Sequence, residues 1–208
     1  MDVARMIYVF DAYCAWSYGF AQTMVDIATL HPGIEVEVVS GGLYVGQGRV
    51  PIRQLRDVRA TNRRISDLTG VWFGDGYERL TADGSFVMNS VAAARGFAAL
   101  RRAAPERAVE LSAALHEAFF VDGMSLAEPS THKRIAVSYG LDADAVVAGF
   151  DHPWSLGVAQ DDFAKVREMG VRAFPTLLVQ VGDRMVPVMV GAATAQQVEE
   201  RLGVFLRG

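Results

Sequence analysis

The sequence predicts an α/β fold, in which helices flank a central mixed β-sheet and a helical block is inserted between the two halves of that sheet. Three observations predict it: a strand–helix–strand start, a long helical middle, and a return to two strands and a helix at the end. Both ends must therefore fold together. We expect a discontinuous first domain over 1–50 and 152–208, and an inserted helical domain over 51–151.

The first unit has the pattern of a parallel strand–helix–strand pair. Residues 5–10 are β-branched and aromatic, which is typical of a short buried strand. Apolar residues then recur with helical spacing from Ser17 to His31, and the following Pro32-Gly33 ends that helix. Apolar and acidic residues alternate over 34–38, which predicts a half-buried strand parallel to the first.

The middle of the chain is mostly helical. Pro51 is a common first-turn residue and predicts a helix over 51–69, whereas the Gly-, Asp- and aromatic-rich residues 70–86 predict a loop. Further helices are bounded by capping residues, prolines or glycines. They are expected from Asn89 or Ser90 to about Ala103, from Pro105 to Gly123, from Ser130 to Tyr139, and from Asp142 to Phe150.

The last part returns to strands. Pro187 falls inside the second of them, and because proline has no N–H to give, this strand should lie at the edge of the sheet. The expected elements are a helix over 155–169, a strand over 176–181, a hairpin turn at Gly182-Asp183, a strand over 185–190 and a helix over 195–206.

Composition limits the partners and the compartment. Among 208 residues, 20 Lys and Arg stand against 24 Asp and Glu, so the net charge of −4 offers no overall cationic field for nucleic acid or anionic lipid. No apolar run approaches a membrane span, and the N-terminus does not have the pattern of a signal peptide. One cysteine excludes an internal disulfide or a multi-cysteine metal site. We therefore expect a cytoplasmic protein.

That cysteine, Cys14, falls where the first strand passes into the first helix. Helix N-termini present unpaired N–H groups and a positive dipole end, which stabilise a thiolate and can lower its pKa from about 8.5 to ~3.5–7.5. Ser17 is three residues later, on the same helical face, where its hydroxyl could donate to the thiolate. The sequence predicts an activated thiol at Cys14.

A second segment of interest, Phe174-Pro175-Thr176, lies directly before a predicted buried strand. Proline has no N–H for the sheet, and in a tight turn its peptide bond can be cis. The Phe174 backbone would then be free to pair with an extended peptide or a thiol ligand.

The strand–Cys-x-x-Ser–helix start resembles the Cys-x-x-Cys active site of the thioredoxin superfamily, and Phe174-Pro175-Thr176 resembles its cis-proline loop. Within that superfamily the chain is similar to the DsbA-like branch with its inserted helical domain, and specifically to the FrnE-like disulfide isomerases. Related members are 2-hydroxychromene-2-carboxylate isomerases and kappa-class glutathione transferases, which have Ser where this chain has Cys14. The residues that carry the resemblance are Asp11, Trp16, Tyr18-Gly19, Gly41-Gly42-Leu43, Asn89-Ser90 and Ala118-Phe119-Phe120.

The resemblance implies a thioredoxin-like sheet and a site in which Cys14 and Ser17 are catalytic. Ser17 stands where dithiol members have a resolving cysteine, which puts dithiol oxidase or reductase chemistry in doubt. Ala12 replaces a family proline, and we expect that to change only the local turn. The side chains implied to contact substrate are Tyr13, Trp16, Phe174, Pro175 and Thr176.

Other polar residues near the motif have two interpretations. Asp11 either raises the pKa of Cys14 by like-charge repulsion or binds nearby backbone. The arginines at 49, 53, 56, 59, 63 and 64 are either a solvated face or a basic rim that attracts an anionic thiol such as glutathione. The histidines at 31, 116, 132 and 152 have no metal-ligand spacing and are expected to be structural or on the surface.

These residues predict a monothiol thiol–disulfide oxidoreductase or isomerase, with mixed disulfides resolved by an external thiol. The expected partners are a disulfide-containing protein or a small thiol, with glutathione or another low-molecular-weight thiol as co-substrate and no tightly bound cofactor. No nucleic acid, membrane or metal is expected, and a homodimer is one open alternative. Two other functions stay open: a glutathione-dependent transferase or isomerase, and a non-catalytic binding or chaperone module.

Overall fold

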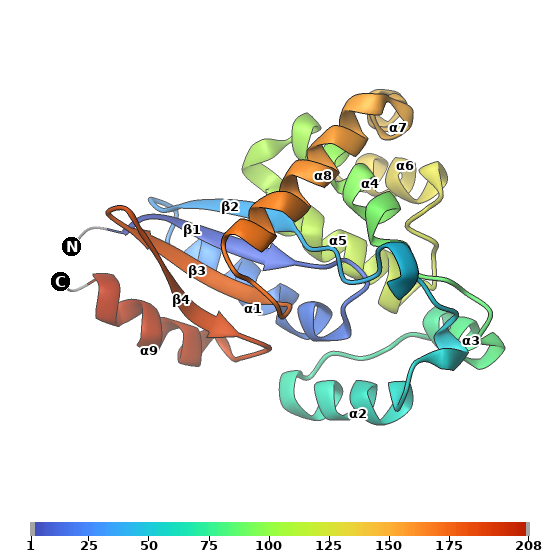
Figure 1. The fold of residues 1–208 in the computed structure, drawn as a ribbon, viewed down its shortest axis with the longest axis horizontal. Helices are drawn as coiled ribbons and strands as arrows, with labels where there is room; N and C mark the ends of the chain where they lie inside the picture. Colours follow the sequence, from blue (N-terminus) through green and yellow to red (C-terminus); the bar gives the residue numbers. More distant parts are fainter. Residues whose placement is uncertain (1–2, 207–208) are drawn as a thin grey trace.

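A four-stranded mixed sheet forms the centre of the computed structural model, which describes residues 3–206 (Figure 1). The strands are β1 (Val3–Phe10), β2 (Glu35–Ser40), β3 (Thr176–Val181) and β4 (Arg184–Val190), in the order β2-β1-β3-β4. β1 pairs in parallel with β2 and antiparallel with β3, and β3 forms a hairpin with β4. The predicted mixed sheet and the edge position of the strand that contains Pro187 are confirmed.

Helices cover both faces of the sheet, because alternate residues of a strand point to opposite sides. On one face, Met6, Tyr8 and Phe10 pack in the large core with residues of α1 (Ala15–Leu30) and α9 (Ala195–Leu206). On the other face, Ile7 and Val9 pack with Val166 of α8 (Pro153–Glu168), the helix that crosses in front of the sheet in Figure 1.

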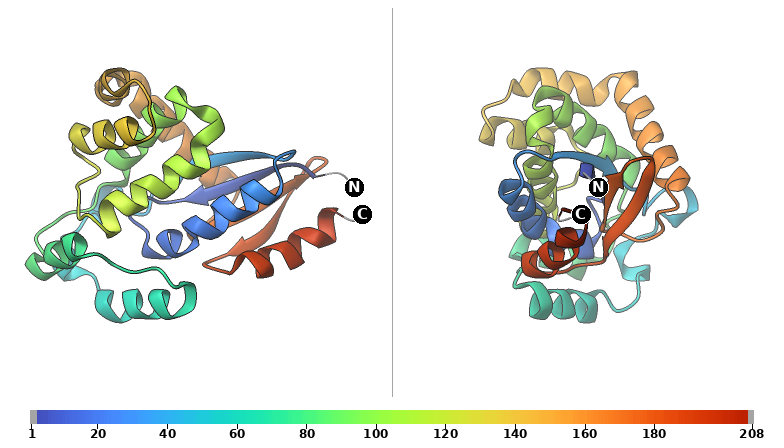
Figure 2. Two further views of the ribbon diagram at one scale, coloured as in Figure 1. Left: turned by 180° about the vertical axis from the view of Figure 1, so that it is seen from behind. Right: turned by 90° about the vertical axis from the view of Figure 1, so that its left-hand side faces the viewer.

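The helical residues between β2 and α8 gather at one end of the sheet (Figures 1 and 2). The large core is continuous from the strands into this block, since Phe10 packs edge-on against Phe97, with 5.0 Å between the ring centres, and Leu111 and Phe119 belong to the same cluster. The domain boundaries at 50/51 and 151/152 stay a prediction. The helices of the block are α2 (Val58–Thr69), α3 (Asp75–Asp83), α4 (Ser90–Ala103), α5 (Ala108–Phe120), α6 (Pro129–Ser138) and α7 (Ala143–Asp151), with 3-10 turns η1 (Gly46–Gly48), η2 (Ile52–Gln54) and η3 (Pro105–Arg107).

Two predicted segments are wrong. The helix expected over 51–69 begins only at Val58, because Asp57 takes a left-handed backbone conformation (φ 55°) that no continuous α-helix accommodates. The loop expected over 70–86 contains the helix α3. Gly76, which contributed to the prediction of a loop, has another role in the structure. A Cβ on Gly76 would lie 2.0 Å from the carbonyl oxygen of Asp122, so the glycine permits close backbone packing.

No helix within residues 3–206 is both long and apolar enough to span a membrane.

Candidate functional site

Cys14 is the N-cap residue of α1, at the point where the chain leaves β1. Its N–H donates to the carbonyl oxygen of Asp11 at 2.9 Å, and its own carbonyl accepts from the N–H of Tyr18 at 3.0 Å. The turn and the first helical bond therefore fix the backbone on both sides of the sulfur.

The Cys14 thiol faces the loop before β3. Its Sγ donates to the carbonyl oxygen of Phe174 at 3.4 Å, and the peptide bond between Phe174 and Pro175 is cis. The Phe174 N–H makes no hydrogen bond within residues 3–206. The structure thus brings together the two segments that the sequence singled out, 160 residues apart in the chain.

Two neighbours shape that loop. The Phe174 ring packs over Gly41, where a Cβ would lie only 2.5 Å from the ring. Thr176 is buried, and its hydroxyl donates to the carbonyl oxygen of Ala173 at 2.8 Å. Thr176 therefore holds the loop from within, whereas the Phe174 backbone is the part that adjoins the thiol.

The predicted lowering of the Cys14 pKa is wrong for this structure. The side chain lies almost wholly inside the protein, with 7% exposure, and burial raises the pKa of the thiol to about 11. Hydrogen bonding from Ser17 and from the Trp16 backbone lowers it, and the charge of Asp11 raises it. The helix N-terminus lowers the pKa of Cys14 as expected, but the loss of hydration on burial raises it by more.

Asp11 is a buried acceptor for the backbone around the thiol. Its Oδ1 accepts from the N–H of Tyr13 at 3.0 Å and its Oδ2 from the N–H of Leu43 at 2.9 Å. Burial raises the pKa of Asp11 to about 6, against these hydrogen bonds, which lower it. Both interpretations of Asp11 are confirmed: it binds backbone, and it raises the pKa of Cys14.

The other predicted residues of the motif surround the sulfur at different depths. Ser17 is fully buried and its Oγ accepts from the N–H of Asp11 at 3.4 Å. Trp16 is half-buried, with the guanidinium of Arg64 5.8 Å from the centre of its ring. Tyr13 is buried, and its hydroxyl oxygen accepts from the N–H of Leu126 at 3.1 Å.

His116 is a residue of the site that the sequence did not identify. It lies on α5, fully buried, and its Nε2 lies 3.2 Å from the carbonyl oxygen of Asp11, the oxygen that also accepts from Cys14. Burial lowers the pKa of His116 to about 4, so the ring is neutral and donates. In the sequence, His116 stands in an apolar predicted helix, four residues before Phe120, and nothing in that pattern indicates contact with Asp11.

A pocket of about 210 Å³, here called the inner pocket, adjoins residues 10–18, here called the cysteine turn. The sequence predicted Tyr13 at this site but not Tyr44, Asn62 or Tyr77, because these three come from segments far from Cys14 in the chain. It is lined by Tyr13, Ala15, Tyr44, Ile52, Leu55, Arg56, Val58, Thr61, Asn62, Tyr77, Met88 and Phe120. Burial raises the pKa of Tyr44, whose hydroxyl therefore stays protonated at neutral pH.

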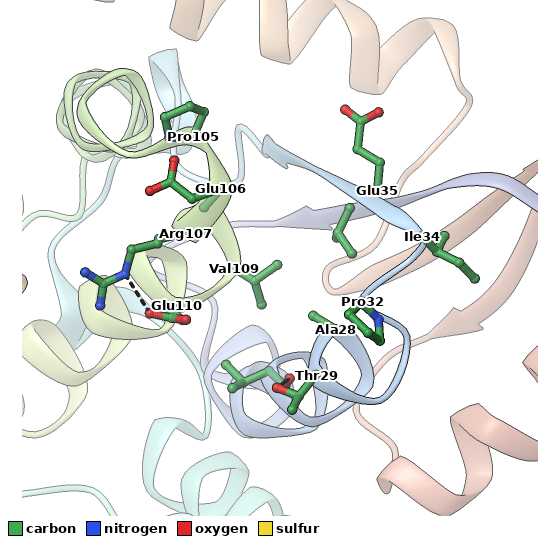
Figure 3. Close-up of a pocket in the computed structure, with 13 residues that line it drawn as sticks. Ala28, Thr29, Pro32, Ile34, Glu35, Pro105, Glu106, Arg107, Val109 and Glu110 are labelled. Atoms are coloured by element: carbon green, nitrogen blue, oxygen red, sulfur yellow. Dashed lines mark hydrogen bonds and ion pairs between the residues drawn. The ribbon is translucent and has the colours of Figure 1, made fainter.

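A hollow of about 500 Å³ at the other end of α1 is separate from this site (Figure 3). Ala28, in its wall, is 14 residues from Cys14, or about 21 Å along a helix. Three glutamates line it, and one of them, Glu110, is paired with Arg107 at 3.0 Å. None of the predicted site residues lies in it.

Within residues 3–206, no group of three or more His, Cys, Asp or Glu side chains is placed to hold a metal ion. The residues of the site offer one thiol, one buried carboxyl group, one buried imidazole and hydroxyl groups.

The family model described as DSBA-like thioredoxin domain matches residues 5–203 of this chain. No curated protein matches it.

Solved structures with the same fold cover nearly the whole chain. A candidate protein disulfide isomerase from Nitrosomonas europaea is 22% identical, with a TM-score of 0.85 over 99% of this chain and 98% of that one. The cytosolic disulfide reductase DsbM from Pseudomonas aeruginosa is 23% identical, with a TM-score of 0.80 over 98% of each chain. A 2-hydroxychromene-2-carboxylate isomerase is 16% identical, with a TM-score of 0.69 over 97% of this chain and 96% of that one.

Proposed function

Because this chain belongs to the family of DSBA-like thioredoxin domains, we propose that it is a thiol–disulfide oxidoreductase or isomerase that reacts through Cys14 alone. The observation that carries the proposal is the position of the Cys14 Sγ, at the start of α1 and 3.4 Å from the Phe174 carbonyl oxygen beside the cis proline. The sequence holds one cysteine, so a second thiol must come from another molecule.

The proposed reaction is a series of thiol–disulfide exchange steps that begins at Cys14. Cys14 attacks one sulfur of a substrate disulfide, the S–S bond breaks, and the leaving sulfur takes the Cys14 proton to become a free thiol. The Phe174 backbone binds the partner while it is joined to Cys14. An external thiol then attacks the Cys14 sulfur of the mixed disulfide, which releases the substrate with both of its sulfurs as free thiols and leaves the external thiol bonded to Cys14. A second external thiol attacks that bond, Cys14 regains a proton, and the two external thiols leave joined by a disulfide, so the substrate is reduced at their expense. If instead a different thiol of the substrate attacks the substrate sulfur of the mixed disulfide, Cys14 is released and the substrate disulfide is rearranged.

The burial of Cys14 supports reduction or rearrangement over oxidation. A disulfide oxidant is strong when its reduced form is stabilised, usually as a thiolate. Here burial raises the pKa of the Cys14 thiol, so the thiolate is not stabilised. A thiol of high pKa is also a poor leaving group, so the mixed disulfide releases the partner more readily than it releases Cys14.

Glutathione is the external thiol that we propose, or another thiol of low molecular weight. One of the similar structures is DsbM from Pseudomonas aeruginosa with GSH, which supports this choice. That relative is described as cytosolic, and the single cysteine fits a reducing compartment, so we propose a cytoplasmic location.

A second candidate function is a glutathione-dependent transferase or isomerase. The inner pocket favours it, since an aromatic-walled hollow of about 210 Å³ beside Cys14 could hold a small apolar substrate next to a bound thiol. In that case Cys14 or Ser17 would orient the thiol of glutathione without forming a covalent bond to it.

Intact-mass measurement after incubation with oxidised glutathione tests the proposal. We expect a glutathione adduct on the wild-type protein, removed by reduced glutathione, and catalysed reduction of a model disulfide. Cys14→Ser should lose both, whereas Ser17→Ala should keep the adduct. Absence of any adduct would overturn the proposal. Retained isomerase or transferase turnover in Cys14→Ser would favour the second candidate. A protein that is inactive in every one of these assays would instead be a binding module.

A further inference from the structure

One segment beside the site has a charge opposite to that of the whole protein. Residues 49–82, here called the arginine segment, contain seven arginines and four acidic residues, in a chain whose net charge is −4. All seven arginine side chains are exposed, and none forms an ion pair with another part of residues 3–206. Their charge is therefore available to a partner.

Part of this segment borders the cysteine turn directly. Arg64 lies over the ring of Trp16, with its guanidinium carbon 5.8 Å from the ring centre. Arg56 lines the inner pocket together with Tyr13 and Ala15, the two neighbours of Cys14 in the sequence. A molecule whose disulfide reaches Cys14 would therefore have positive charge beside it.

The segment also forms a larger groove, of about 580 Å³, between α2 and α3, here called the outer groove. Arg59 and Arg63 stand on its α2 side, and the exposed ring of Trp72 lies on another wall. Glu78 contributes one carboxylate from α3. The groove thus offers two guanidinium groups and aromatic surface to a bound chain.

The outer groove and the inner pocket share a wall. Asn62 and Tyr77 line both hollows, and the Asn62 amide donates to the Tyr77 hydroxyl at 3.5 Å. Arg56 therefore lies in the hollow on one side of this shared wall, and Arg59 and Arg63 lie in the hollow on the other side. Arginine binds carboxylates through paired hydrogen bonds, which fits several acidic side chains across the two hollows.

We propose that the outer groove docks an acidic stretch of the disulfide-bearing protein substrate, so that charge selects the substrate before Cys14 reacts. This deepens the proposed function, on which it rests. The occupant is a peptide chain because the positive charge is spread over two adjacent hollows, with Arg56 in one and Arg59 and Arg63 in the other, which an extended chain can cover together. Opposite charge accelerates encounter and adds affinity, both of which salt weakens.

The test uses two peptides with the same disulfide, flanked either by four Asp or by four Asn residues. Binding is measured on the Cys14→Ala variant, which cannot exchange. We expect the Asp peptide to bind about tenfold more tightly than the Asn peptide in low salt, and that difference to shrink in 0.5 M salt. Equal binding of the two peptides would overturn the proposal.

Two double variants locate the effect. In the Cys14→Ala background, Arg59→Gln with Arg63→Gln should remove most of the preference for the Asp peptide. The matched control, Arg167→Gln with Arg184→Gln, changes two exposed arginines outside the segment and should keep it. If the control variant loses the preference for the Asp peptide to the same extent, the preference depends on net charge alone. That result would contradict docking in the outer groove.

Exchange rates with active Cys14 distinguish the two proposals. Arg59→Gln with Arg63→Gln should slow reaction with the Asp peptide and leave reaction with oxidised glutathione unchanged. An equal slowing with both would overturn the assignment to a peptide. If the Asp preference in binding persists but neither peptide reacts with the wild-type protein, the docking site stands and the exchange function fails.

Discussion

The cysteine turn, residues 10–18, and the arginine segment, residues 49–82, form two sides of the same site and are built in opposite ways. In the turn, the carbonyl oxygen of Asp11 accepts from both Cys14 and His116, and the two carboxylate oxygens of Asp11 accept from backbone N–H groups. The arginine segment buries little besides Ile52, Ile65 and Tyr77, and leaves its charges in solvent.

The difference separates two tasks. Disulfide exchange needs a sulfur held in one position, and buried hydrogen bonds supply that because each is costly to break. Recognition of a charged partner needs positive charge near the site, which exposed arginines supply without fixed geometry. Changes in the turn should therefore have large effects on stability and chemistry, and changes in the arginine segment small ones.

The largest effect is expected at Gly41. Its replacement by alanine would place a Cβ 2.5 Å from the Phe174 ring, so the ring must shift, and we expect the shift to displace the Phe174 carbonyl oxygen that contacts Cys14. We expect disulfide exchange to slow by about a hundredfold, as small displacements at reacting atoms can do, and stability to fall by about 1–3 kcal/mol. Exchange assays and urea unfolding measure both.

Gly33→Ala is the control for Gly41→Ala. Nothing lies within 4 Å of a Cβ at Gly33, which follows α1 at the end remote from Cys14. Its exchange rate should match that of the wild type. Unchanged exchange in Gly41→Ala would show that the position of Phe174 does not matter to the reaction.

His116 should make the turn sensitive to acid. Burial lowers the pKa of His116 to about 4, so its contribution to stability is present above about pH 6.5 and is lost as the pH falls toward 4. The loss can reach about 3 kcal/mol. His116→Gln keeps an N–H donor for Asp11 but does not titrate. The free energy of unfolding of the variant should therefore fall less than that of the wild type when the pH is lowered from 7.5 to 4.

Urea unfolding between pH 7.5 and 4 measures this comparison. A difference between wild type and His116→Gln that does not change with pH would contradict it. His132 has the same shift from burial, with its Nε2 3.0 Å from the carbonyl oxygen of Leu126, and His132→Gln should repeat the trend in a part of the block away from Cys14.

Local pattern predicted most of the fold, because strands, caps and hairpin turns depend on neighbours in sequence. The bounds of α9 match its predicted range of 195–206, and Asn89 caps α4 as expected, accepting from the N–H of Ala92 at 3.3 Å. The pairing of Cys14 with Phe174 was also predicted, on the strength of the family resemblance, and the structure places them in contact.

Long-range burial decided what the sequence could not predict. The pKa of Cys14 depends on how completely distant segments cover the sulfur, and a helix N-terminus gives no information on that. His116 and Asn62 have no local signal, because their partners, Asp11 and Tyr77, are set by tertiary packing. Gly76 was interpreted as a loop residue although its role is close contact with Asp122.

Asp11→Asn removes the negative charge of the turn and replaces one of its two acceptor oxygens by an amide donor. Removing the negative charge should lower the pKa of Cys14, since that charge raises it. At pH 8 we expect alkylation of Cys14 to accelerate about threefold to tenfold. Alkylation rates measured against pH check this, with Asp67→Asn, an exposed change on α2, as the control. A slower or unchanged rate in Asp11→Asn would show that its hydrogen bonds matter more than its charge.

Arg64→Gln should have the smallest effect and lies where the two regions meet. The guanidinium is exposed and its contact with the Trp16 ring is worth about 0.5–1 kcal/mol at most, so stability should stay within about 1 kcal/mol of the wild type. Alkylation of Cys14 should not change, because the sulfur is held by the turn and not by this side chain. Exchange with the Asp peptide should slow by about threefold, since one positive charge beside the site is lost. A large change in alkylation would instead mean that the arginine segment helps to position the thiol, and that the two regions are not independent.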